Sequence, residues 1–182
     1  MPLVTKVRDL MIPLSDYAVV NVNDPLKDAA LCLRRVYCEA QTGSCTEAGH
    51  RSALVLDDDD KLVGILDFKS ILSVFIPEIA GGLTEKLKAL GVTITFAEAD
   101  AVDLDEANLS LRARVIKNAE VPVKQVMLKV RGTIHPDADV LQALKMIYQN
   151  KITVLPVVDG DTLIGIVRDS DLFLNVASIL AD

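Results

Sequence analysis

The chain has 182 residues and a formal net charge of −7, and 51% of its residues are hydrophobic and 25% charged. This length suits one domain or two small half-domains with a shared core, and the hydrophobic content argues against wholesale disorder. The acidic balance without a dense Lys/Arg cluster argues against nucleic acid as a partner, and the longest apolar stretch, around residues 71–76, falls far short of the roughly 20 residues of a membrane-spanning helix.

The N-terminal residues carry mixed charges and lack an apolar run followed by a small-residue cleavage site. We therefore expect no secretory signal and a cytoplasmic protein. A segment that ends in Met, VRDLM at residues 7–11, precedes an extended apolar stretch at residues 18–22. The low aromatic content, 4% with no Trp, favours aliphatic strands that are covered by helices.

A helix is predicted to follow this stretch. Asp24 is a candidate N-cap, and Pro25 suits the first helical position. Apolar residues then recur at helical spacing from Leu26 to Tyr37, which predicts a helix with one apolar face.

Residues 38–50 have the Gly, Ser and Thr content of a surface loop, which we interpret as slack or a partner contact. Cys38, Cys45 and His50 lie in this loop, and Cys32 lies in the preceding helix. An odd number of cysteines without C-x-x-C spacing argues against a disulfide framework or a structural zinc site. Core or loop thiols are the simpler interpretation, and redox sensing or metal capture by the loop is the alternative.

Two short runs of β-forming residues, 53–56 and 62–66, flank an acidic turn at residues 57–60 and predict a hairpin. A helix over residues 68–76 closes this part of the chain. The predicted order of elements is therefore β-α-β-β-α.

Residues 77–122 are too long for a simple turn. Gly81 and Gly82 break the chain, and residues 104–118 are rich in helix formers. We predict an ordered, partly helical connector.

The remaining residues repeat the first pattern. VKQVM at residues 123–127 matches VRDLM, and Asp159-Gly160 is a strong turn signal. Asp137 or Asp139 can cap the first helix of this second copy. We predict an extended stretch at residues 132–136 and a first helix at residues 140–148. Two hairpin strands are predicted at residues 153–158 and 163–167, and the last helix at residues 169–180.

The chain therefore divides into repeat 1 at residues 1–76, the connector at residues 77–122 and repeat 2 at residues 123–182. The predicted fold class is α/β (α+β), with two β-α-β-β-α repeats packed around a pseudo-two-fold axis.

This arrangement resembles a tandem pair of CBS domains, a regulatory module also called a Bateman module. Repeat 2 carries most of the resemblance, because residues 156–159 and 165–167 match the strand signatures of the family and Asp171 matches its acidic position. Arg168 stands where the family usually has Thr or Ser.

The resemblance implies that an adenosine-containing ligand, such as AMP, ADP, ATP or S-adenosylmethionine, binds in a cleft of repeat 2. One carboxylate can accept hydrogen bonds from both ribose hydroxyls, which suits Asp171. The turn through Ser170 would present helix amides to phosphates, and the forked cation of Arg168 would either strengthen polyphosphate binding or occlude the site. The resemblance assigns adenine contacts to Gly132, Thr133, Ile134, Ile152, Val154 and Pro156.

Each of these assignments has a structural alternative. Core packing is the favoured explanation of the apolar residues. Asp171 can instead cap the last helix, with Asp169 and Ser170 as rival caps.

The corresponding site of repeat 1 lacks these features. Leu54 replaces the strand proline, Asp67 stands at the Thr position, and Ser70 stands at the acidic position. Ser70 offers one hydroxyl where a bidentate carboxylate is needed, and Asp67 would repel phosphate. We therefore predict at most one nucleotide per chain.

We predict neither catalysis, nor a catalytic cofactor, nor a metal. His50 and His135 have no evident nucleophile partner, and the glycines form no phosphate-cradling motif. The leading hypothesis is an adenosine-ligand sensor that signals to an effector protein, and the resemblance also implies a homodimer formed through helices. The alternatives are an interaction scaffold without a ligand and a redox-responsive module that uses Cys38 and Cys45.

Overall fold

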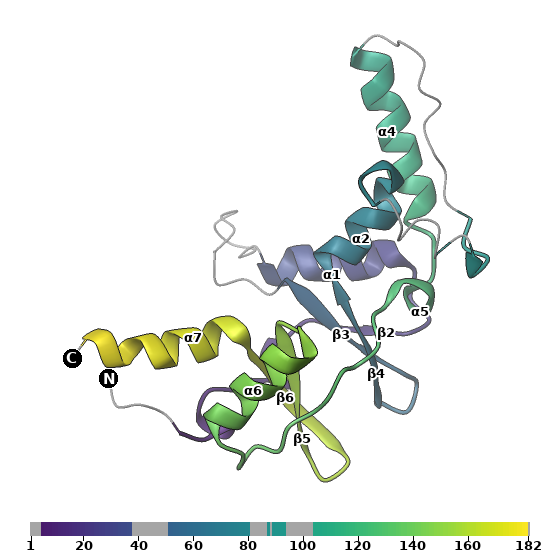
Figure 1. The fold of residues 1–182 in the computed structure, drawn as a ribbon. Helices are drawn as coiled ribbons and strands as arrows, with labels where there is room; N and C mark the ends of the chain where they lie inside the picture. Colours follow the sequence, from purple (N-terminus) through teal and green to yellow (C-terminus); the bar gives the residue numbers. More distant parts are fainter. Residues whose placement is uncertain (1–4, 38–50, 81–86, 88, 94–103, 182) are drawn as a thin grey trace. The chain divides into compact units, whose positions relative to one another are not determined.

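The structure is a computed structural model, shown in Figure 1, which describes residues 5–37, 51–80, 87, 89–93 and 104–181. The predicted loop at residues 38–50, with Cys38, Cys45 and His50, lies outside the described residues. The chain forms two compact units. The contiguous unit is Ala18–Lys129, and the split unit combines Met1–Tyr17 with Val130–Asp182.

The contiguous unit contains a three-stranded sheet in the order β2-β3-β4. Strand β2 (Val19–Asn21) is parallel to β3 (Ser52–Leu56), which is antiparallel to β4 (Leu62–Asp67). Helices α1 (Leu26–Tyr37) and α2 (Phe68–Phe75) lie together over this sheet (Figure 1). The predicted β-α-β-β-α order of repeat 1 is confirmed.

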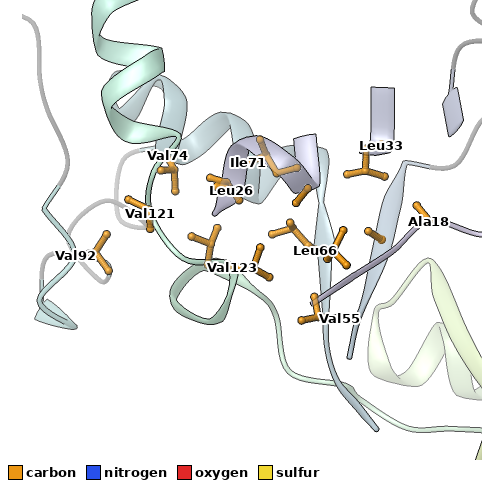
Figure 2. Close-up of a cluster of buried hydrophobic side chains, with 14 of the residues drawn as sticks. Ala18, Leu26, Leu33, Val55, Leu66, Ile71, Val74, Val92, Val121 and Val123 are labelled. Carbon is orange, nitrogen blue, oxygen red and sulfur yellow. The ribbon is translucent and has the colours of Figure 1, made fainter. Parts of the chain in front are cut away.

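Aliphatic side chains from the sheet, both helices and the chain after the connector form the core of the contiguous unit (Figure 2). Leu26 of α1 and Leu66 of β4 are fully buried. Ile71 of α2 and Val123 pack in the same cluster. The apolar stripe of the predicted helix therefore faces the sheet, as its spacing indicates.

The connector is partly helical, as predicted, and polar contacts join its helix α4 (Leu104–Asn118) to the end of α2 and to the 3-10 turn Pro77–Ile79 that follows α2. The Asn118 side-chain amide donates to the carbonyl of Val74 over 3.0 Å. One turn earlier, buried Arg114 pairs with Glu78 at 2.6 Å. Because the last carbonyls of a helix lack intrahelical partners, Asn118 satisfies part of the C-terminus of α2.

The split unit contains a second three-stranded sheet, in the order β1-β6-β5. Both pairs are antiparallel, and the strands are β1 (Ile12–Pro13), β6 (Thr162–Arg168) and β5 (Val154–Asp159). Helices α6 (Val140–Asn150) and α7 (Asp169–Ala177) share a core with this sheet. The last helix is shorter than predicted, because a 3-10 turn over Ser178–Ala181 follows it.

The predicted first strand of repeat 2, residues 132–136, is reduced to a single bridge. Ile134 forms a parallel bridge to Val157, with hydrogen bonds of 2.9 Å to the neighbouring residues Pro156 and Val158. Gly132 bends the backbone at φ +112°, and Pro136 has no N–H to donate. Strand β1 pairs with β6 at the opposite edge of this sheet, and the sequence did not predict this strand.

The two segments that end in Met make equivalent backbone hydrogen bonds, each to the strand-to-helix turn of the other repeat. Val7 donates to Ala138 over 3.0 Å, and Val123 donates to Asp24 over 2.9 Å. The next residue of each segment also donates to that turn, Arg8 to Pro136 and Lys124 to Val22. The Met-ending segments are therefore exchanged between the repeats.

Residues two positions before each of these segments satisfy the first amides of α1 and α6. Leu26 of α1 donates to Val121 over 2.8 Å, and Val140 of α6 donates to Thr5 over 2.9 Å. The prediction that Asp24 caps α1 is wrong, because its carboxylate accepts from the amide of Asn21. Backbone carbonyls take the role that sequence reasoning gave to a side chain.

The compact units thus divide the chain differently from the sequence repeats. The sequence places residues 1–17 with repeat 1 and residues 123–129 with repeat 2, whereas the structure packs each segment with the other repeat. A repeat detected by sequence similarity is therefore not a compact unit by itself.

Matched glycines in the two repeats test this packing. A Cβ at Gly165 would overlap the backbone carbonyl of Ile12, whereas one at Gly64 would meet mainly the flexible side chain of Met127. We expect Gly165→Ala to lower the free energy of unfolding by about 1–3 kcal/mol and Gly64→Ala to cost less, because a side chain can move aside. Urea unfolding of both variants measures the difference, and equal losses would contradict the assigned pairing of β1 with β6.

Candidate functional site

All residues predicted to bind the ligand lie in the split unit. They come from the segment before α6, from β5 and the residues before it, and from the junction between β6 and α7. In chain order they are Gly132, Thr133, Ile134, Ile152, Val154, Pro156, Arg168, Ser170 and Asp171.

The junction between β6 and α7 is organised by a forked ion pair. The Nε of Arg168 donates to Oδ2 of Asp171 over 2.8 Å, and its Nη2 donates to Oδ1 over 2.6 Å. The two side chains are only 18% and 16% exposed. Both carboxylate oxygens that were predicted to accept ribose hydroxyls therefore already accept from Arg168.

The pair also fixes the charge of Arg168. The hydrogen bond to Asp171 raises the pKa of Arg168 above its ordinary value, while burial acts in the opposite direction. Coulombic interactions with Tyr17 and Asp169 add smaller upward contributions. Arg168 is therefore a cation at any physiological pH, and a ligand would meet a charged guanidinium.

Asp171 does not cap α7. Arg168 is the N-cap residue and makes no side-chain capping bond, and Asp171 faces it from the first turn. The amide of Asp169 donates to the carbonyl of Thr153, and that of exposed Ser170 donates to Oδ1 of Asp169. Asp171 is therefore the ion-pair partner of Arg168 and not the cap of α7.

The residues assigned to the adenine divide by burial. Ile134, Val154 and Pro156 are buried, and Ile134 belongs to the core cluster of the split unit. Gly132 and Ile152 are half-buried, and Thr133 is exposed. Ile134 therefore packs in the core, which is the structural alternative to its assigned contact with the adenine.

The hairpin register determines which of these residues lie near the ion pair. Val154 is directly opposite Arg168 in the β5-β6 ladder, so the start of β5 lies beside the pair. Ile134 is bonded to Pro156, farther along the same strand. Gly132 lies against Met146 and Asn150 of α6. The structure thus brings Val154 to the ion pair and links Ile134 to it only through β5.

The corresponding junction in repeat 1 is closed by its own side chain. Asp67 is the N-cap of α2, and its Oδ1 accepts from the amide of Ser70 over 2.7 Å. Ser70 is only 3% exposed, and Leu54 is fully buried. A carboxylate already occupies the helix start where a phosphate would have to bind.

Sequence reasoning missed the neighbourhood of Tyr17. This buried tyrosine contributes to the electrostatics of Arg168, and the 3-10 turn before it, Leu14–Asp16, contacts β6. The residue was overlooked because residues 1–17 were assigned to repeat 1. A strand prediction for Ile12–Pro13 would have been the signal, but two residues are too few for a periodicity.

Other kinds of site find no support in the part of the chain that the structure describes. Its His, Cys, Asp and Glu residues form no group of three or more that could hold a metal ion. Among the same residues, no helix is both long and apolar enough to span a membrane. Cys32 is half-buried in α1, with its thiol 3.8 Å from the carbonyl of Val19, which fits a core thiol.

Comparisons with known proteins give a consistent result. The family model for the CBS domain matches residues 7–76 and 121–178. The comparison with curated proteins finds no match.

Solved structures of CBS proteins share the fold. CBSX2 in complex with AMP is 20% identical, with 96% of this chain and 97% of that chain covered and a TM-score of 0.59. The CBS-pair protein CBSX2 from Arabidopsis thaliana is 19% identical, with 97% of each chain covered and a TM-score of 0.62. The cytosolic domain of the Mg²⁺ channel MgtE in complex with ATP is 19% identical, with 94% of this chain and 48% of that chain covered and a TM-score of 0.57.

Two Arg–Asp pairs in the split unit allow a matched test of the forked pair. We expect Asp171→Ala to lower the free energy of unfolding by about 1–3 kcal/mol, because it leaves a mostly buried guanidinium without this carboxylate. Asp137→Ala removes the half-exposed partner of Arg8 and should cost about 0–1 kcal/mol. Urea denaturation at neutral pH measures both losses, and a smaller loss for Asp171→Ala than for Asp137→Ala would contradict the forked geometry.

Proposed function

This chain belongs to the CBS domain family, and we propose that it is a non-catalytic regulatory module that binds one adenosine-containing ligand per chain in the split unit. The observation that carries the proposal is the junction between β6 and α7, where Arg168 and Asp171 lie within one helical turn. A carboxylate suits the two ribose hydroxyls, and a guanidinium suits phosphate.

The start of α7 adds a second element that favours an anion. The positive end of the helix dipole lies here, although the amide of Ser170 already donates to Oδ1 of Asp169. The solved CBS structures with AMP and with ATP support this class of ligand. We infer that AMP, ADP, ATP or S-adenosylmethionine is the signal, with the adenine beside Val154 at the start of β5.

Repeat 1 is proposed to carry no ligand. Its helix start is occupied by Asp67, and Ser70 cannot replace a bidentate carboxylate. A stoichiometry of one ligand per chain follows from this difference between the repeats.

The output of the module is proposed to be a change in its association with an effector protein. A ligand can shift such an equilibrium only by the difference between its affinities for the two states. Exposed apolar side chains on α7 and the turn that follows it support a homodimer through this helix. Those more than half exposed are Phe173, Leu174, Ile179 and Leu180.

A scaffold without a ligand is the second candidate function. The observation that favours it is the forked pair itself, because Arg168 engages both oxygens of Asp171. In a scaffold the pair would only stabilise the turn between β6 and α7.

Calorimetric titration with AMP, ADP, ATP and S-adenosylmethionine separates the two candidates. We expect saturable binding of about one ligand per chain, because only one repeat has a carboxylate at the acidic position. Asp171→Ala should abolish binding, and Ser70→Ala, the matched substitution in repeat 1, should leave it unchanged. Folded protein that binds none of the four ligands would instead support the scaffold.

The homodimer has its own test. Leu174→Glu introduces a charge into the exposed apolar face of α7 and should convert dimer to monomer, because an unpaired carboxylate is costly to bury at an interface. Sedimentation velocity measures the change. Leu31→Glu, at an exposed position of α1, is the control and should remain dimeric. A wild-type protein that sediments as a monomer would contradict this part of the proposal.

A further inference from the structure

We infer that Arg168 makes the site selective for adenosine ligands that carry a phosphate, because only an anion can replace Asp171 as its partner. This inference rests on the proposed function and specifies the ligand class. The family usually has a hydroxyl residue at the position of Arg168. This chain instead has a cation there, which is bonded to Asp171, the predicted acceptor of the ribose hydroxyls.

A neutral nucleoside would have to compete with this pair. Ribose hydroxyls would replace a forked pair, in which both groups are charged, with hydrogen bonds from neutral donors to Asp171. The displaced guanidinium lies in a site where its side chain is only 18% exposed, so it would lose its carboxylate without full access to water. Removing one partner of a buried charge pair is costly for this reason.

A ligand with a phosphate can replace Asp171 as the partner of Arg168. Its oxygens match the fork of a guanidinium as well as a carboxylate does, so Arg168 can leave Asp171 without losing a charged acceptor. The carboxylate released in this way becomes available to the two ribose hydroxyls. Phosphate binding and ribose binding are therefore coupled through one side chain.

The surrounding charges decide how strong this preference can be. Asp169, the first residue of α7, is exposed and opposes an anion, although its field is screened by solvent. The start of α7 favours an anion, and Arg168 would contact it directly. S-adenosylmethionine has a sulfonium cation where a nucleotide has its first phosphate, and its carboxylate lies farther from the ribose, so nucleotides should bind more tightly than S-adenosylmethionine.

Affinities of adenosine and AMP for three proteins test the inference. The proteins are the wild type, Arg168→Thr, which restores the residue type usual in the family, and Arg8→Thr, which removes an arginine from an exposed ion pair of the same unit. Wild type should bind AMP at least about tenfold more tightly than adenosine. Arg168→Thr should bind adenosine more tightly than wild type does and reduce the AMP preference by about tenfold, and Arg8→Thr should behave as wild type.

Arg168→Lys separates the charge from the fork. Lysine keeps the cation but cannot form the bidentate contact with a carboxylate. It should therefore bind adenosine more tightly than wild type does, while keeping more of the preference for AMP than Arg168→Thr. Circular dichroism and thermal unfolding establish that each variant is folded.

The possible results distinguish the inference from the proposed function. Equal affinities for AMP and adenosine in wild type, unchanged by Arg168→Thr, would overturn the inference and leave the proposed function standing. Loss of all binding in Arg168→Thr would also overturn the inference. The inference would fail as well if Arg168→Thr gained adenosine binding while the wild type bound no AMP. Absence of binding by every folded protein, with adenosine and with each of the four ligands of the calorimetric titration, would overturn the proposed function and the inference with it.

Discussion

Backbone hydrogen bonds from residues 5–8 and 121–124 close the strand-to-helix turn of each compact unit, and much of the structure depends on them. The first amides of a helix have no intrahelical partners, and the carbonyls of Thr5 and Val121 satisfy them at α6 and α1. The N-terminal segment then continues into β1, which pairs with β6. Strand β6 therefore lies between β1 and β5, and it leads directly into Arg168 and α7.

The two repeats use this common frame differently because their N-cap residues have opposite charges. In repeat 1, Asp67 turns onto its own helix and accepts from Ser70. In repeat 2, Arg168 cannot accept from an amide, and it reaches Asp171 instead. The N-cap residue, three positions before Ser70 or Asp171, thus decides whether its side chain accepts from a helix amide or pairs with the residue at the acidic position. One substitution changes both the electrostatics and the availability of the neighbouring acceptor.

The sequence predicted the local elements well and the non-local contacts poorly. The hairpins and helices follow from β-branched runs, turn residues and helical spacing, which are local signals. The exchange of the Met-ending segments involves partners far apart in the chain, as in Val7 with Ala138, and leaves no periodicity to read. The strand predicted at residues 132–136 failed because Gly132 and Pro136 interrupt its ladder. For the site, residue types predicted a carboxylate and a cation, but only geometry shows that Asp171 and Arg168 bind each other.

The split unit also imposes an order on how the chain can fold during its synthesis. Residues 7–13 are synthesised before their partners, Ala138 and Gly165 among them, which follow more than a hundred residues later. At typical rates of about 5–20 residues per second, this segment waits on the order of ten seconds without its partners. The contiguous unit can be complete by then. The split unit is therefore completed after the contiguous unit, because its N-terminal strand must wait for β6.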